Sequence, residues 1–337
     1  MALSYRSSVA VIVLAVVVST SVTACLPRSA VDAPPVSNTD SGAGLSVDRS
    51  VRVLATTDFG AEMLLDETLP LEPGMSALDA LQRVADVGTL YGGGFVDSIN
   101  GVGPGRTAGQ SKNAGWFYSV NGVMANGAAG GYTLRPGDVE HWDHHDWTFR
   151  QFVSAGIGCF PSAFVHGYDG TVYPTVVAYG DSYAAEADDL AAVLEEAGAL
   201  GVQRLPVSQL LPGHRESGNL VLVADSTAGP VVELNQQWDR LGLFAQFVDS
   251  ALQTYTGSGA ESERYLDGVG LLQAMQSPWN PSGVGVCENV VVLVSGSDTD
   301  GVRAAAGALA EGHEAMTYWC AAVVCDGEAH RIPSAGD

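Results

Sequence analysis

Gly115-Trp-Phe-Tyr-Ser-Val-Asn-Gly122 decides the fold of the first half of this 337-residue chain. Successive side chains of an extended segment point to opposite faces, so Trp116 and Tyr118 are predicted to share one face of a strand. Phe117 is predicted to lie on the other face. Three segments follow the strand. They are the glycine loop Gly127-Ala-Ala-Gly-Gly-Tyr132, the turn Arg135-Pro-Gly-Asp138 and the polar strand Val139-Glu-His-Trp-Asp-His-His-Asp-Trp147.

The residues before this segment predict two strands, one helix and a third strand. Ser76 is a candidate helix N-cap, and Asp79 stands where a capping box requires an acid. The pattern predicts a small α+β domain over residues 50–147, with a sheet packed against one helix. The expected elements are strands over 51–57, 62–69 and 95–99, a helix over 76–86 and a glycine-rich loop over 100–114.

Several motifs of this region occur in the order of a known family. They are Pro73-Gly-Met-Ser-Ala-Leu-Asp-Ala-Leu81, Phe95-Val-Asp-Ser-Ile-Asn-Gly101, the strand 115–122, Gly130-Gly-Tyr132 and Arg135-Pro-Gly-Asp138. Residues 50–147 therefore resemble the bacterial family called domain of unknown function 4430. That family is similar to the C-terminal β-domain of the vertebrate cobalamin carriers, transcobalamin and intrinsic factor. The helical barrel that completes the vertebrate ligand site is not encoded here.

The resemblance implies binding of cobalamin or another corrinoid. In the vertebrate carriers the matching aromatic strand and glycine loop lie near the corrin, and here the loop has Gly where the carriers have an acid. Aromatic faces suit a large flat ligand, although the same rings also suit a hydrophobic core. The ligand-binding residues expected on this basis are Trp116, Tyr118, Asn121, Tyr132 and Trp142.

The segment 139–147 carries a second possible site. On a strand, His141, Asp143 and His145 point to one face, and imidazole with carboxylate can bind zinc or copper. A histidine could also offer an axial nitrogen to the cobalt of a corrinoid. The alternative is an edge strand with a solvated polar face, which is the interpretation that we favour.

The second half, residues 148–337, alternates strands with helices. This alternation, together with the apolar character of the strands, predicts an α/β domain with a mainly parallel sheet. This half also resembles the C-terminal portion of actinobacterial lipoproteins that carry the same N-terminal domain. The segments that carry the resemblance are Phe164-Val-His-Gly167, Leu243-Phe-Ala-Gln-Phe247 and Asp300-Gly-Val-Arg303. The expected strands are 173–178, 219–224, 243–248, 289–295 and 320–325, and the expected helices end near 197, 241 and 311.

Gly180-Asp-Ser-Tyr183 follows an apolar strand and resembles the nucleophile block of a hydrolase class. Such a serine needs a histidine base and an orienting acid, for which Asp326 and His330 are the candidates. Their spacing differs by one residue from that class. We interpret Asp181 or Ser182 as a helix cap and expect no enzyme activity.

The first 25 residues predict a lipoprotein signal peptide. Arg6 precedes an apolar core over 9–18, and Val22-Thr-Ala-Cys25 resembles a lipobox whose Cys25 is lipidated. A plain secretory peptide or an uncleaved anchor is the alternative. Residues 26–49 are predicted to form a flexible tether. With the lipidated cysteine before it, we expect a protein anchored by lipid on the extracellular face of the cell membrane.

Composition limits the possible partners. The formal net charge of −23 opposes binding to nucleic acid. With Cys25 lipidated, four cysteines remain, Cys159, Cys287, Cys320 and Cys325, and an even count in an exported protein predicts two disulfides. A four-cysteine zinc site is the weaker alternative.

These observations predict a non-catalytic binding protein of the cell surface, with cobalamin as the candidate ligand and no required cofactor. The expected partners are a small flat ligand, the membrane and an uptake transporter. A cell-envelope interaction module is the first alternative function. A metal site at His141, Asp143 and His145 is the second.

Overall fold

The computed structural model of the protein describes residues 49–103 and 113–334. They belong to one compact unit, Ser46–Asp337. The predicted signal peptide, Cys25 and the tether up to residue 48 lie outside the described residues, as does most of the loop 100–114. Within the described ranges, no helix is both long enough and apolar enough to cross a membrane.

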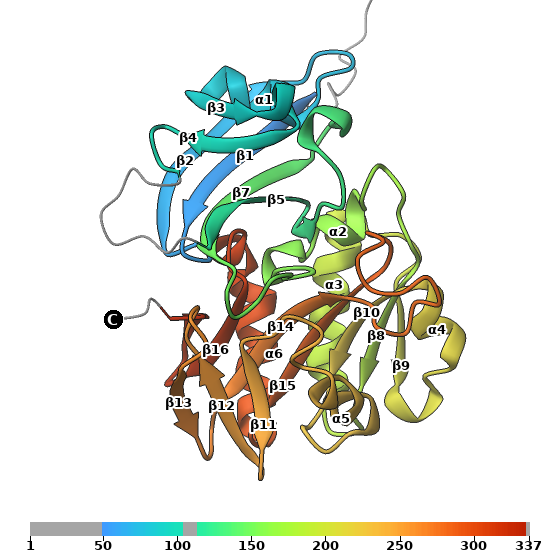
Figure 1. Cartoon of the computed structure of the whole chain (residues 1–337). Helices are drawn as coiled ribbons and strands as arrows, with labels where there is room; N and C mark the ends of the chain where they lie inside the picture. Colours follow the sequence, from blue (N-terminus) through green and yellow to red (C-terminus); the bar gives the residue numbers. More distant parts are fainter. Residues whose placement is uncertain (1–48, 104–112, 335–337) are drawn as a thin grey trace, which may run out of the picture. The chain divides into compact units, whose positions relative to one another are not determined.

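The first part of the chain forms a five-stranded sheet in the order β2-β1-β7-β5-β6 (Figure 1). β1 and β7 pair in parallel, whereas β1–β2, β5–β7 and β5–β6 pair antiparallel. Strands β1, β2 and β5 confirm the strands predicted over 51–57 and 62–69 and the predicted aromatic strand. The bounds are β1 Ser50–Thr57, β2 Glu62–Pro70, β5 Ala114–Val120, β6 Val123–Met124 and β7 Val139–Asp146.

One helix covers this sheet. Helix α1 (Ala77–Val84) begins after Ser76, whose side chain accepts a hydrogen bond from the Asp79 amide while the Asp79 carboxylate accepts one from the Ser76 amide. This confirms the predicted capping box. Leu81 is fully buried in the core of this part, a burial worth about 1.5–3 kcal/mol.

A hairpin that the sequence patterns did not fully predict follows the helix. Strand β3 (Val87–Leu90) pairs with β4 (Phe95–Ile99), and Leu90 stands opposite Phe95. The short 3₁₀ turn between them is Tyr91–Gly93. The hairpin brings three large apolar side chains, Leu90, Tyr91 and Phe95, to the surface.

The second part is built on a seven-stranded sheet in the order β17-β16-β14-β15-β10-β8-β9 (Figure 1). β9, β8, β10 and β15 pair in parallel, and β14, β16 and β17 add antiparallel pairs, so the sheet is mixed. β10 and β15 are buried along their whole length, as continuous apolar strands covered on both faces are. The bounds are β8 Thr175–Tyr179, β9 Gln203–Pro206, β10 Asn219–Val223, β14 Gly270–Gln276, β15 Val290–Gly296, β16 Ala321–Cys325 and β17 Glu328–Ile332.

Helices and a small sheet cover this larger sheet. Helices α3 (Ala184–Ala197) and α6 (Thr299–Gly312) share one hydrophobic cluster with it. Helix α5 (Gly229–Gln236) and a three-stranded sheet share a second cluster with it. That sheet contains β11 Ala245–Val248, β12 Ala251–Tyr255 and β13 Glu261–Tyr265. The short helices α2 and α4 span Ser162–Val165 and Pro212–Ser217.

Two predictions for this half were wrong in detail. The helix expected to reach residue 241 ends at Gln236. The strand expected over 243–248 joins the small antiparallel sheet rather than the main one, because Asp249 and Ser250 both have positive φ and turn the chain directly into β12.

The two parts contact each other through side chains far apart in sequence. The Arg331 guanidinium in β17 donates to the carbonyls of Asp58 and Phe59, both at 3.2 Å. The Phe59 ring lies 4.9 Å from that of Phe244. The domain boundary predicted at residue 147 stays a prediction, but residues on its two sides are in direct contact.

Candidate functional site

Strands β5 and β7 give the molecule two different faces. Trp116 stands opposite His144, Phe117 opposite Asp143 and Tyr118 opposite Trp142 in this antiparallel pair. Trp116, Tyr118 and Trp142 belong to the core beneath helix α1. The Phe117 ring stacks on His145, 4.5 Å between centroids, on the opposite face. This confirms the predicted alternation of the aromatic strand.

The indole and hydroxyl groups of the aromatic face are hydrogen-bonded within the protein. The Trp116 indole N–H donates to the Val102 carbonyl at 3.1 Å, and the Tyr118 hydroxyl to the Gly127 carbonyl at 2.9 Å. The Trp142 indole N–H donates to the Glu140 carboxyl. Burial raises the pKa of Glu140 well above its ordinary value.

Two cavities lie on either side of the glycine loop. The aromatic cavity has a volume of about 170 Å³ and is bounded by Phe95, Trp116, Tyr118 and Trp142. The tyrosine cavity has a volume of about 490 Å³ and is bounded by Tyr118, Tyr132, Tyr168, Arg135 and Asp169. Both cavities also have Gly127 and Ala128 in their walls. Four of the five predicted ligand-binding residues therefore line one or both cavities.

The loop glycines leave these cavities open. A Cβ atom at Gly127 or Gly131 would meet no heavy atom within 4 Å, and neither residue has a positive φ. Glycine is therefore not required there by the backbone or by packing. At these two positions the missing side chain enlarges the tyrosine cavity.

Asn121, the fifth predicted residue, is fully buried. Its amide donates to the Asp138 carboxylate and to the Gly167 carbonyl, both at 2.8 Å, and its side-chain oxygen accepts from the Val139 amide at 3.0 Å. With φ of +53° it makes the turn after β5. It connects the strand to residue 167 rather than lining either cavity.

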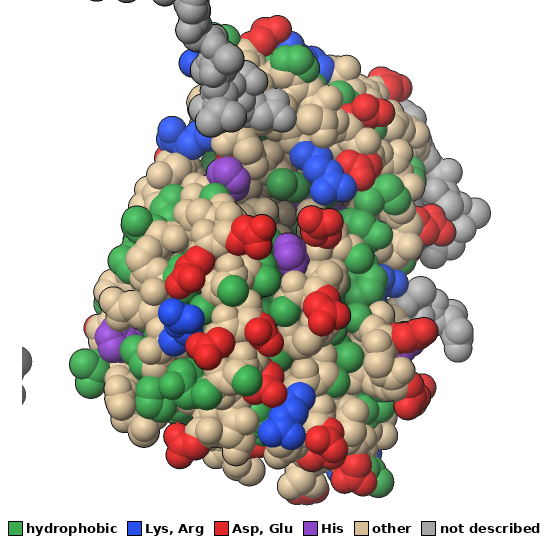
Figure 2. Space-filling view, turned by 180° about the vertical axis from the view of Figure 1, so that it is seen from behind, with side chains coloured by type: hydrophobic (Ala, Val, Ile, Leu, Met, Phe, Trp, Pro, Cys, Tyr) green, Lys and Arg blue, Asp and Glu red, His purple; other side chains and the backbone are tan. Residues whose placement is uncertain are grey.

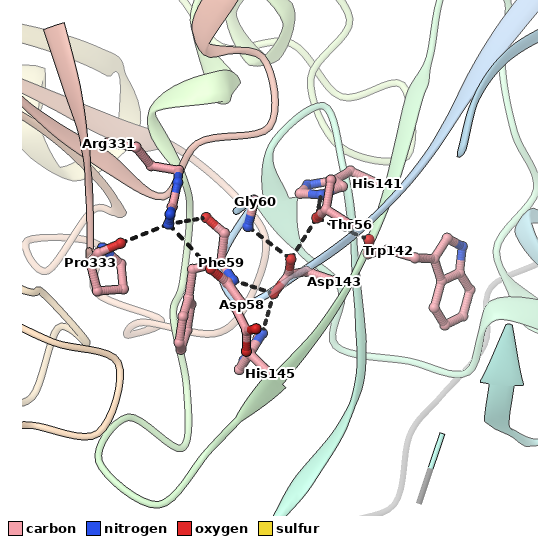
Figure 3. A network of polar contacts seen from close by, with 10 residues as sticks. All are labelled: Thr56, Asp58, Phe59, Gly60, His141, Trp142, Asp143, His145, Arg331 and Pro333. Carbon is pink, nitrogen blue, oxygen red and sulfur yellow. Dashed lines mark hydrogen bonds and ion pairs between the residues drawn. The ribbon is translucent and has the colours of Figure 1, made fainter. Parts of the chain in front are cut away.

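The opposite face of β7 carries a polar cluster around Asp143 (Figure 3). The buried Asp143 carboxylate accepts hydrogen bonds from the Thr56 hydroxyl and from the amides of Phe59 and Gly60, at 2.5, 2.9 and 2.9 Å. His145 Nδ1 lies 2.7 Å from the same carboxylate, and His141 Nε2 lies 2.7 Å from the Thr56 hydroxyl. These contacts join β1, the β1–β2 turn and β7.

The Asp143 carboxylate is the charged centre of the cluster. Burial alone would raise the pKa of Asp143, but the hydrogen bond and charge of His145, the charge of His141 and the Thr56 hydroxyl together hold it well below its ordinary value. Burial lowers the pKa values of His141 and His144. Asp143 is therefore an internal anion that holds the strained turn at 58–60, where three successive residues have positive φ.

This cluster encloses a cavity of only about 70 Å³, lined among others by His141, Asp143, His145 and Cys320. Its volume is far below that of a small-molecule site. Within the described residues, no three His, Cys, Asp or Glu side chains are placed to hold a metal ion. His141, Asp143 and His145 do share a face, but the Asp143 oxygens are occupied by protein donors.

Sequence reasoning missed the apolar rim, which we define as Leu90, Tyr91 and Phe95. Their exposed fractions are 43%, 90% and 45%. Phe95 and the adjacent Gly94 also line the aromatic cavity, which places the β3–β4 turn at its edge. Tyr91 has φ of +52°, an unusual conformation for an aromatic residue. The available signal was the run Leu90-Tyr-Gly-Gly-Gly-Phe95, a hairpin turn between exposed apolar residues.

The Gly180–Tyr183 segment has neither predicted role. Helix α3 begins at Ala184, and its N-cap residue is Tyr183, with no side-chain cap, so Asp181 and Ser182 are not caps. The Tyr183 hydroxyl instead donates to Asp225. Ser182 is exposed in the turn after β8, whereas His330 lies on β17 at the opposite edge of the sheet. The predicted hydrolase partners are therefore not brought to Ser182.

The four cysteines are free thiols, so the expected disulfides are not formed. Cys320 immediately precedes β16 and Cys325 ends it, about 16 Å away for an extended segment, well beyond disulfide reach. Burial raises the pKa of Cys159 and of Cys320 to about 12. The Cys287 thiol donates to the Met124 carbonyl at 3.1 Å.

Acidic side chains are spread over the face shown in Figure 2, with arginines between them. On this face of the described residues the basic groups do not gather into a stripe. A search of the curated proteins found no match to the chain. Residues 74–146 match the family model described as "Domain of unknown function (DUF4430)", which supports the predicted domain family over the segment that supplies most of the lining of both cavities.

Proposed function

We propose that this protein is a non-catalytic binding protein of the cell surface, and that its ligand binds around the glycine loop 127–131. The observation that carries the proposal is the pair of cavities that share Tyr118, Gly127 and Ala128, of which the aromatic cavity borders the apolar rim at Phe95. The tyrosine cavity, about 490 Å³, lies within the usual range for small-molecule sites.

A corrinoid is the specific ligand that we propose, on the strength of the transcobalamin-like motifs. Its flat ring is too large for either cavity, so it would lie against the apolar rim while its amide side groups enter the cavities. Tyr91 and Phe95 would supply the ring contacts, since exposed aromatic faces bind flat apolar surfaces. We further propose lipid attachment at Cys25, display on the outer face of the membrane and transfer to an uptake transporter.

The test is titration of the full chain, held in detergent, with hydroxocobalamin by calorimetry. We expect saturable binding that weakens about tenfold in Tyr91→Ala and in Phe95→Ala, as for aromatic contact residues. Leu211→Ala is the matched control, because Leu211 is 61% exposed but belongs to the second part of the chain. Absence of binding up to high micromolar hydroxocobalamin would rule out the corrinoid.

The apolar rim also favours a second candidate, a protein-interaction module of the cell envelope, since clustered exposed apolar side chains often mark interfaces. In that case hydroxocobalamin would not bind. Crosslinking at residue 91 in the intact envelope would capture a protein, and the same label at residue 211 would not.

A further inference from the structure

The two cavities differ in chemistry, and the difference defines the ligand. In the aromatic cavity, the polar atoms of Trp116, Tyr118 and Trp142 already have partners within the protein. A ligand group entering this cavity therefore meets ring faces and no unpaired donor from these side chains. An apolar cavity of about 150 Å³ in another protein is sufficient for benzene. The aromatic cavity, at about 170 Å³, has room for one ring.

The tyrosine cavity is polar but electrically balanced. The charged side chains among its described lining residues are Arg135 and Asp169, which form an ion pair with 2.7 Å between Nη2 and Oδ1. The Tyr132 hydroxyl accepts from the Asp169 amide at 2.9 Å. Burial raises the pKa values of Tyr132 and Tyr168, so both hydroxyls stay protonated. The cavity offers hydrogen-bonding groups without a net charge.

The loop between the cavities allows one molecule to use both. Tyr118, Gly127 and Ala128 are common to the two walls, so the cavities adjoin at these residues. Gly127 carries no side chain, and a Cβ atom there would meet no heavy atom within 4 Å. A ligand seated in the tyrosine cavity, against the contacting rings of Tyr132 and Tyr168, can thus extend one ring past Tyr118.

We infer that the site selects a neutral, two-part ligand: one aromatic or compact apolar group for the aromatic cavity, joined to an uncharged amide- or hydroxyl-bearing part for the tyrosine cavity. This inference rests on the proposed function but does not depend on the corrinoid. A charged ligand would have to leave water without an unpaired counter-charge among these lining residues, which costs free energy.

Three matched probes test the charge rule: indole-3-acetamide, indole-3-acetate and tryptamine. They share the indole ring and differ in the charge of the attached group. With the full chain in detergent and ligand-observed NMR, we expect the amide to bind about tenfold more tightly than either charged analogue. Equal or tighter binding of a charged probe, or no binding of the amide at millimolar concentration, would overturn the inference.

The location is tested with the double variant Gly127→Ala/Gly131→Ala. The new methyl groups are added to two lining residues of the tyrosine cavity and meet no heavy atom within 4 Å, so the fold should persist while binding of indole-3-acetamide weakens at least fivefold. Gly307→Ala in α6 is the control, because a Cβ there also meets nothing within 4 Å. Unchanged binding in the double variant would overturn the assignment of the site.

The results of the indole-probe experiments can be distinguished from the result of the cobalamin titration. Binding of the amide without binding of hydroxocobalamin keeps the ligand class and removes the corrinoid. Binding of hydroxocobalamin without preference for the neutral probe keeps the proposed function and removes the inference drawn here.

Discussion

The two faces of strands β5 and β7 differ in how closely their side chains are packed, although both are built by the same alternating sequence. On one face the buried Asp143 carboxylate has four partners, and the space around it is only about 70 Å³. On the other face the polar atoms of the aromatic side chains are hydrogen-bonded to other groups of the protein, and two larger cavities remain beside these side chains. The closed face holds the structure together, and the open face has the features of a binding surface. The closed face follows from Asp143, because a buried charge requires hydrogen-bonding partners packed around it.

The largest effect should follow from removing the charge of the closed face. In Asp143→Ala, the Phe59 and Gly60 amides and the Thr56 hydroxyl lose their acceptor inside the protein. We expect the free energy of unfolding to fall by about 3–5 kcal/mol, measured by urea denaturation. Asp66→Ala is the control, because its ion pair with Arg52 is exposed and should be worth at most about 1 kcal/mol. Equal losses in the two variants would contradict the structural role of Asp143.

Glycine substitutions contrast the two faces directly. Gly60 has φ of +84°, and a Cβ there would lie 2.5 Å from the Tyr318 carbonyl oxygen. Gly60→Ala should therefore lower the midpoint of thermal unfolding and cost about 1–3 kcal/mol. Gly127→Ala on the open face should be neutral or slightly stabilising. A stable Gly60→Ala variant would show that the turn at 58–60 is not held tightly.

The buried Glu140 on the open face predicts a pH dependence. Because its folded-state pKa is raised, the unfolded chain loses this proton first, at about pH 4.3, and stability then falls as pH rises toward the folded pKa. Over that interval the wild type should lose about 1.4 kcal/mol per pH unit relative to Glu140→Gln. Urea denaturation of both proteins from pH 4.5 upward measures the gap. A difference in unfolding free energy that does not grow with pH would contradict the raised pKa of Glu140.

The smallest effect concerns the wall between the cavities. Tyr118→Phe removes the hydroxyl that donates to the Gly127 carbonyl, which should cost about 0.5–1.5 kcal/mol. Faster amide hydrogen exchange in the loop 127–131 should accompany this loss. Tyr91→Phe is the control, since Tyr91 is 90% exposed and its hydroxyl should contribute little. Unchanged exchange in Tyr118→Phe would show that the loop is held by other contacts.

The structure departs from the sequence predictions where contacts span long distances along the chain. The cysteine count predicted disulfides, but all four thiols are free, and Cys320 and Cys325 are held apart by the extended strand β16 between them. The segment 139–147 was expected to be an edge strand with a solvated polar face, but β7 lies in the middle of its sheet and Asp143, His144 and His145 are buried. Asp143 instead accepts a hydrogen bond from Thr56, 87 residues earlier in the chain. The apolar rim was missed because exposure depends on how the hairpin β3–β4 sits on the sheet.

By itself, the sequence determined the local features of this protein. The capping box at Ser76, the alternation of Trp116, Phe117 and Tyr118 and the domain family over residues 74–146 all depend on neighbours within a few residues or on ordered motifs. Only the tertiary structure decided which face of the sheet is closed and which is open. The partners of Asp143 and the walls of the two cavities come from separate strands and loops, and their packing is set by side-chain volume and burial rather than by any local pattern.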